Sequence, residues 1–154
     1  MNWDALSAIG TLIGSVTVLV TLILLAIQIG QNTRALRSAS FHQVRDSFSE
    51  IPLAIAQDSE LAGIISRVSA NPRSLSVEEI LRYEMLLLSI VRKSESAFYQ
   101  TSEGALHMDS WNGIAQTCRS ALSDEIAIAW WNRSKNRFNS SFSRAIDDMI
   151  SRSI

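Results

Sequence analysis

This chain of 154 residues has a single cysteine and almost no net charge. Cys118 is the only cysteine, so no intramolecular disulfide can form, which is compatible with a reducing compartment. The chain carries 14 Lys and Arg against 15 Asp and Glu, a formal net charge of -1. A protein that binds nucleic acid in bulk needs a basic face, so this balance argues against nucleic acid as a partner.

The sequence also lacks the motifs of common catalytic and cofactor sites. It contains no GxGxxG, no Walker loop, no GxSxG and no HExxH. His42 has Asp46 four residues later and His107 has Glu103 four residues earlier, but neither pair has metal-site spacing. Cys118 lies on the apolar side of its expected helix, which favours core packing. We therefore expect no catalytic residue, metal or cofactor, and a function other than that of an enzyme.

Charge is missing altogether from Ala5 to Ile29, and every Lys and Arg lies after position 33. These 25 residues would form a helix of roughly 37 Å, enough to cross a hydrocarbon core of about 30 Å. The run is apolar on every side, unlike a core helix of a domain this small. No basic segment precedes it and no small-x-small cleavage site follows, which disfavours a signal peptide. We expect a transmembrane anchor over 1–30 and a second domain over 31–154.

The charges that flank the apolar run predict its orientation. Asp4 precedes it, whereas Arg34, Arg37 and Arg45 follow it. Basic residues stay on the cytoplasmic side, so we expect the N-terminus outside and the C-terminal domain in the cytoplasm. Trp3 is placed where an interfacial aromatic residue would hold the outer end.

Small and weakly polar residues share one side of the expected span. Gly10 and Gly14 form a small-xxx-small pair, which allows two helix backbones to approach closely. Spacings that alternate between four and three extend this side as a heptad pattern, typical of a left-handed helix–helix contact. The expected helix-packing face consists of Ser7, Gly10, Thr11, Gly14, Val18, Thr21 and Gln28.

This packing face needs a partner from outside the chain, because one span has no second helix of its own. The partner would be another copy, giving a homo-oligomer, or another membrane protein. Two alternatives remain open. The hydroxyl groups can bond to their own backbone in lipid, or Ser7, Thr11 and Thr21 can line a homo-oligomeric pore, although no charged ring marks a selectivity site.

Helical patterns continue beyond the span, without any period-two strand pattern. Residues 31–50 contain no Gly or Pro, and an apolar stripe follows at spacings of three and four, so the first helix should run on until Pro52 kinks or ends it. The stripe consists of Phe41, Val44, Phe48, Ile51 and Ile55.

Capping residues predict where the later helices begin. Asp58 can cap one helix, and Ser76 with Glu79 forms a capping box that opens a helix over about 77–102. The apolar segment LLLSIV makes that helix central to the bundle. Residues 103–107 should form a loop, Ser123 can cap the segment that carries the two adjacent tryptophans, and the last helix should follow Asn139.

Polar residues on the apolar side of the central helix suggest a candidate pocket. Buried carboxylates must be paired, and Arg92 and Arg119 are available partners. Structural salt bridges are one interpretation, and a polar ligand pocket of a small-molecule sensor or enzyme is the other. The candidate pocket residues are Glu84, Glu95, Tyr99 and Gln100.

Basic residues beside aromatic ones give a candidate membrane-surface contact. Such a cluster can bind anionic lipid at about 1 kcal/mol per basic residue. The alternative is two core tryptophans beside a solvated loop. The residues of this candidate contact are Arg34, Arg37, Trp130, Trp131, Arg133, Lys135 and Arg137.

Three segments carry a resemblance to a known group of proteins. They are QNTRALRSASFHQ after the apolar run, SESAFYQ at 94–100 and AWWNRSKNRFNSSF at 129–142. In order and spacing the chain resembles a widespread group of small bacterial membrane proteins. The resemblance implies a single span in a bacterial inner membrane and assigns no activity. This chain departs from the pattern at Asn-Ser-Ser before Phe142, where many relatives have a Ser-Pro step.

Together these patterns predict an all-α protein, with one N-terminal transmembrane helix that continues into a small cytoplasmic helical bundle. The function they favour is a membrane-anchored, non-enzymatic interaction or accessory module that self-associates or joins a larger membrane complex. Its expected partners are the lipid bilayer and a second copy or another membrane protein. A homo-oligomeric pore or effector, and a sensor or enzyme with a pocket near Glu95, are the alternatives.

Overall fold

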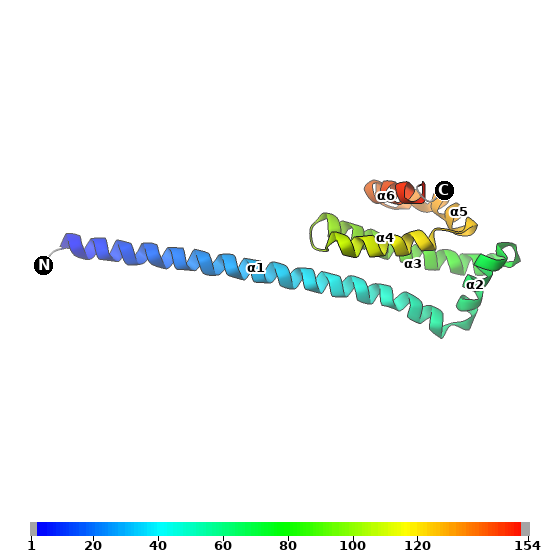
Figure 1. Cartoon of the computed structure of the whole chain (residues 1–154), viewed down its shortest axis with the longest axis horizontal. Helices are drawn as coiled ribbons and strands as arrows, with labels where there is room; N and C mark the ends of the chain where they lie inside the picture. The colour runs from blue at the N-terminus through cyan, green and yellow to red at the C-terminus, as the bar shows by residue number, and fades with distance from the viewer. Residues whose placement is uncertain (1–2, 152–154) are drawn as a thin grey trace. The chain divides into compact units, whose positions relative to one another are not determined.

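The computed structural model describes residues 3–151, so residues 1–2 and 152–154 of the two expected domains lie outside the described part. The described chain is all-helical, with 90% of residues in helices and no strand. The helices are α1 (Trp3–Gln57), α2 (Ser59–Ala70), α3 (Val77–Ser102), α4 (Met108–Ala121), α5 (Glu125–Ser134) and α6 (Ser140–Ser151). Two short 3₁₀ helices, η1 (Pro72–Ser74) and η2 (Lys135–Arg137), complete the chain (Figure 1). The expected all-α fold is confirmed.

The chain divides into two units, one up to Ala39 and one from Ser40 onward. The division falls nine residues later in the sequence than the boundary expected after position 30. The first unit is a helical segment whose side chains are all exposed from Ser7 to Ala39. The second unit holds the rest of α1 and every other helix.

The first helix runs through the expected junction without a break, as the absence of Gly and Pro from residues 31–50 predicts. It does not end at Pro52 but continues to Gln57. Proline removes one backbone donor and so weakens the preceding turn. In that turn the Lys93 ammonium donates to the Ser47 carbonyl and pairs with Glu50 at 2.6 Å, which holds this part of α1 against α3.

Capping residues set the ends of α2 and α3. The Asp58 carboxylate accepts from the backbone N–H groups of Glu60 and Leu61 at 2.9 and 3.1 Å, and so caps α2 as expected. At the start of α3 the Glu79 N–H donates to the Ser76 hydroxyl at 3.2 Å, while the Ser76 N–H donates to the Glu79 carboxylate at 2.8 Å. This reciprocal pair is the predicted capping box, and α3 has the predicted bounds.

Helix α3 is the central helix of the second unit. It lies beside α4 (Figure 1) and also contacts α2 and α5. Leu87 and Val91 from the predicted LLLSIV segment are 1% and 0% exposed. The fully buried side chains around them come from α2, α4, α5, α6 and the residue after α4, and include Ile64, Cys118, Leu122, Trp131, Phe142 and Ile146.

The segments after α3 confirm two predictions, the loop over residues 103–107 and the start of the last helix, and correct one, the cap of α5. Residues 103–107 are the predicted loop, and Gly104 there has a positive φ of 74°, which glycine adopts without strain. His107 caps α4, where its Nδ1 accepts from the Asp109 N–H at 3.3 Å.

The cap of α5 is Asp124 and not Ser123, because the Asp124 carboxylate accepts from the Ala127 N–H at 2.9 Å and from the Tyr83 hydroxyl at 2.5 Å. Ser123 donates instead to the Ser120 carbonyl. The last helix follows Asn139 as expected, with the Asn139 amide oxygen accepting from the Ser141 N–H at 2.9 Å.

Candidate functional site

The apolar part of α1 is the first candidate site. By length and composition, α1 is the one helix among residues 3–151 that could cross a membrane. A Cβ placed at Gly10 or Gly14 would meet no atom within 4 Å, so the predicted packing face is open on this chain. Its other described members, Ser7, Thr11, Val18, Thr21 and Gln28, are exposed as well.

The hydroxyl groups of this helix bond to their own backbone. Thr11 donates to the Ser7 carbonyl at 3.0 Å, and Thr21 donates to the Thr17 carbonyl at 2.8 Å. Thr17 donates to the Ile13 carbonyl at 2.8 Å. A hydroxyl has a single donor, so these groups are satisfied within the helix and can enter hydrocarbon without an unpaired donor. This is one of the alternatives that the sequence left open.

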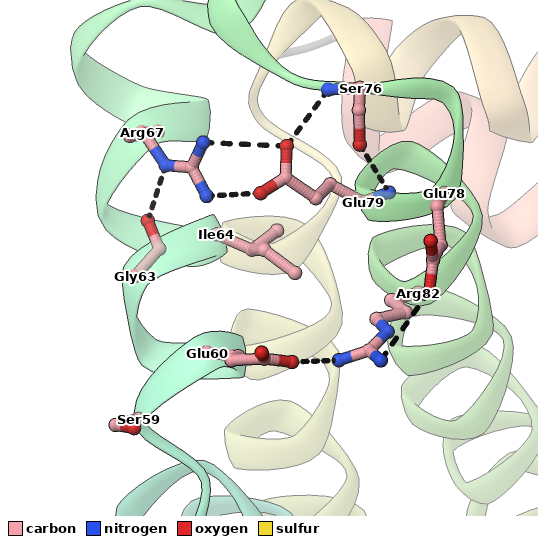
Figure 2. A pocket seen from close by; sticks show the side chains of 9 residues that line it. All are labelled: Ser59, Glu60, Gly63, Ile64, Arg67, Ser76, Glu78, Glu79 and Arg82. Carbon is pink, nitrogen blue, oxygen red and sulfur yellow. Dashed lines mark hydrogen bonds and ion pairs between the residues drawn. The ribbon is translucent and has the colours of Figure 1, made fainter.

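A charged pocket of about 510 Å³ lies between α2 and α3 (Figure 2). The Arg67 guanidinium binds both carboxylate oxygens of Glu79, at 2.5 and 3.3 Å. Arg82 bonds to Glu60 at 2.5 Å and pairs with Glu78 at 3.5 Å. All five charged groups that line this pocket are thereby paired with each other.

The ion pairs of this pocket lower the pKa of Glu79 and join two helices. The hydrogen bonds from Arg67, and then from the Ser76 backbone, lower the pKa of Glu79 to about 2. Because Arg67 and Glu60 belong to α2 and Glu79 and Arg82 to α3, the ion pairs join the two helices. We call this set of residues the α2–α3 clasp, and its geometry is that of a structural contact.

The candidate polar pocket on α3 resolves into separate contacts. Glu84 binds Arg133 of α5 at 2.6 Å. Glu95 binds Arg92 at 2.7 Å and accepts from the Asn139 N–H at 2.8 Å. Of the two possible partners, Arg92 and Arg119, Arg92 binds Glu95. The partner of Glu84 is Arg133, which the sequence did not suggest. These contacts favour the salt-bridge interpretation.

Tyr99 and Gln100 differ from the two glutamates. The Tyr99 hydroxyl and the Gln100 Oε1 atom are buried and have no hydrogen-bond partner among the described residues. The Gln100 side-chain N–H donates to the Ser96 hydroxyl at 3.3 Å. Neither residue lines the pocket between α2 and α3 or the apolar groove between α1 and residues 106–117.

The two adjacent tryptophans do not form the candidate membrane contact. Trp130 and Trp131 are 2% and 1% exposed, so neither ring can reach a membrane surface. The Trp131 indole N–H donates to Asp147 at 2.8 Å, and its ring packs on Phe138 with 5.5 Å between centroids. Both are core residues, which is the alternative that the sequence also allowed.

The basic residues of the same candidate contact are divided between the two units. Lys135 pairs with Asp147 at 2.9 Å and Arg133 with Glu84. The backbone carbonyl of Arg137 accepts from Arg92 at 3.1 Å, while the Arg137 residue is exposed. Arg34 and Arg37 are exposed on the first unit and keep their predicted place beside the apolar run.

An apolar groove of about 620 Å³ lies in the second unit, between residues 41–52 of α1 and residues 106–117. The sequence predicts the α1 side of it, because Phe41, Val44 and Phe48 belong to the apolar stripe. The other wall comes from Leu106 and Ile114. Sequence reasoning missed the groove, because its walls are more than fifty residues apart in the chain and no local motif joins them.

The histidines and the cysteine form no reactive cluster in the described part of the chain, where no three His, Cys, Asp or Glu side chains are grouped to hold a metal ion. Cys118 is 0% exposed, and burial raises the pKa of its thiol to about 11. The thiolate is the reactive form, so this thiol behaves as the core residue expected from its helix face.

Comparison with known proteins adds no functional assignment. No protein-family model, curated protein or solved structure matches the chain.

Proposed function

We propose that this chain is a membrane-anchored, non-enzymatic interaction module that self-associates or joins a larger membrane complex. The observation that carries the proposal is the apolar helix of the first unit, where every side chain from Ser7 to Ile29 is exposed. Monomeric soluble proteins rarely expose a continuous apolar surface of this extent. Lipid would cover most of it, and backbone hydrogen bonds are already satisfied within the helix.

The Gly10–Gly14 face supports the association part of the proposal. Lipid chains are as apolar as leucine, so helices associate in a bilayer through close packing and polar contacts. The two glycines, one turn apart, leave the backbone accessible. Gln28, in the same face, can bond across to its equivalent in a second copy. We therefore infer that the partner helix lies against this face and that the partner is a second copy.

The charges around the helix support an orientation with the second unit in the cytoplasm, and the resemblance to small bacterial membrane proteins supports an inner-membrane location. Asp4 precedes the apolar run and the exposed Arg34 and Arg37 follow it. A reporter fused to the C-terminus should be active in the cytoplasm. Digestion of the second unit by a protease added outside intact cells would reverse this orientation.

The self-association proposal is tested by filling the packing face. Replacing Gly10 and Gly14 together by Ile adds bulk where the facing helix must approach, while Ile still favours membrane insertion. Association should weaken by about 1–3 kcal/mol, by analogy with overpacked cores. The measurement is chemical cross-linking of the full chain in native membranes.

The matched control changes Leu12 and Val16 to Ile on the opposite side of the helix. This variant should cross-link like the wild type. Equal cross-linking of the wild type and of the Gly10/Gly14 variant would mean that this face meets lipid, and self-association through it would have to be abandoned.

A further inference from the structure

The groove between α1 and α4 is a place where two helices of the second unit are incompletely packed. Val44 and Phe48 of α1 meet Ala97, Leu106 and Ile114 in a small apolar cluster. Beyond that cluster the contact opens into the groove of about 620 Å³. Pockets that bind small molecules measure about 300–1,000 Å³ and are mostly apolar, so the groove has the size and the lining of such a site.

Gly113 keeps the α4 wall of the groove open. A Cβ placed at Gly113 would meet no atom within 4 Å, so the position would hold a side chain without a clash. Glycine inside a helix costs about 1 kcal/mol relative to alanine. Its neighbours along the wall are short, because Ser110 and Thr117 lie one turn to either side.

Arg45 gives the groove a single positive charge. It is the only charged residue among those that line the groove. No ion pair or hydrogen bond joins its guanidinium to another described residue, unlike the arginines of the α2–α3 clasp. A guanidinium matches a carboxylate with two parallel hydrogen bonds. The apolar groove with its one unpaired arginine therefore complements a hydrocarbon chain that ends in a carboxylate.

We propose that this groove binds a long-chain fatty acid, with the acyl chain against Phe41, Phe48 and Ile114 and the carboxylate on Arg45. A single cation suits a ligand with one carboxylate. The wall residues supply apolar surface over two turns of α4 and three turns of α1, which suits an extended chain. The site does not depend on self-association through the Gly10–Gly14 face.

The test uses the full chain in nanodiscs of phosphatidylcholine and a palmitate that carries a photoreactive diazirine on its chain. Mass spectrometry locates the label after illumination. The label should appear in peptides that contain residues 41–52 and 106–117. Label in residues 5–29, from probe dissolved in the bilayer, is the internal reference.

Two variants at one position distinguish binding in the groove from nonspecific labelling of the protein. Gly113→Phe fills the groove and should reduce the groove label at least about tenfold, because several methylene contacts are lost, each worth about fourfold in affinity. Gly113→Ala is the matched control and should keep the label. Far-UV circular dichroism and tryptophan fluorescence verify that both variants fold. Equal groove label in Gly113→Phe and wild type would overturn the proposal.

The charge contact is tested by competition with unlabelled palmitate and with its uncharged methyl ester. Palmitate should compete about two- to fivefold better on the wild type, as expected for an exposed ion pair. In Arg45→Gln the two competitors should become equal, while Arg34→Gln should keep the difference. A difference that persists in Arg45→Gln would remove Arg45 from the site.

Other occupants would each give a distinct result. Nanodiscs that contain phosphatidylglycerol should leave the groove label unchanged. If the groove label were lost in the phosphatidylglycerol nanodiscs while residues 5–29 were still labelled, the groove would be assigned to a bilayer lipid. Cross-linking of residues 106–117 to another copy of the chain, with no palmitate label, would assign it to a protein partner. Either result would overturn the fatty-acid proposal.

Discussion

Replacing Trp131 by Ala should destabilise the second unit severely. The side chain is 1% exposed, its indole N–H donates to Asp147 at 2.8 Å, and its ring packs against Phe138 and Phe142 at centroid distances of 5.5 and 6.4 Å. Removing a buried tryptophan costs about 3–5 kcal/mol through lost burial and the cavity left behind. Asp147 keeps Lys135 as a partner, so its charge adds little to the loss.

This loss is large against the total stability of a domain. Domains unfold with about 5–15 kcal/mol, so the variant would be marginally stable. For a unit of this size the melting temperature should fall by on the order of 15 °C. Trp131→Phe keeps an aromatic ring and loses the bond to Asp147, and it should fall between the alanine variant and the wild type. Thermal melts followed by circular dichroism of the full chain in nanodiscs give the measurement.

The control for the tryptophan series is Val77→Ala, because Val77 is 86% exposed and such surface changes are usually within about 0.5 kcal/mol. A core role for Trp131 would be contradicted if Trp131→Ala melted like the wild type and instead lost binding to anionic vesicles. That outcome would restore the membrane-surface role that the burial of the ring excludes.

Three further predictions address the clasp, the cysteine and a helix cap. The pKa of Glu79 is lowered to about 2, so its contribution to stability is present above about pH 4.5 and is lost as the pH falls toward 2. Glu79→Gln should therefore flatten the acid side of a curve of unfolding free energy against pH. An unchanged acid side would contradict this prediction. The pKa of Cys118 is raised from 9.0 to about 11, which lowers its thiolate fraction at pH 8 about a hundredfold, so a maleimide should label it only after denaturation. Asp124→Ala should cost about 1–3 kcal/mol in urea denaturation, since it removes the α5 cap and leaves the Tyr83 hydroxyl unpaired, whereas Ser123→Ala should cost under about 0.5 kcal/mol.

Helix positions followed from the sequence wherever the deciding contact is local. The capping box of Ser76 and Glu79 joins residues three apart, and α3 begins where it predicts. The Asp58 cap is equally local. The apolar stripe of α1 correctly placed Val44 and Phe48 against the bundle, because a period of three and four residues marks one face of a helix.

The errors arise where a distant residue decides between two local options. Ser123 and Asp124 are both good caps, and Asp124 also receives a bond from Tyr83, which is 41 residues away. Glu84 pairs with Arg133 across 49 residues, so no helix-face rule could select that partner.

The candidate sites also depend on contacts between residues that are distant in the sequence. Tryptophans beside basic residues fit a membrane surface or a core, and Phe138 and Phe142 decide for the core. Only the α1 wall of the groove has a sequence signal, because the groove itself forms where α1 and α4 do not fill the space between them.

Disulfide formation between copies is the most direct test of self-association through the Gly10–Gly14 face. Single cysteines at Gly14 and at Val16 would be introduced into the full chain with Cys118→Ser, and oxidised in native membranes. We expect covalent dimers from Gly14→Cys and few from Val16→Cys, because only the first lies in the packing face. Equal dimer yields at the two positions would contradict this expectation.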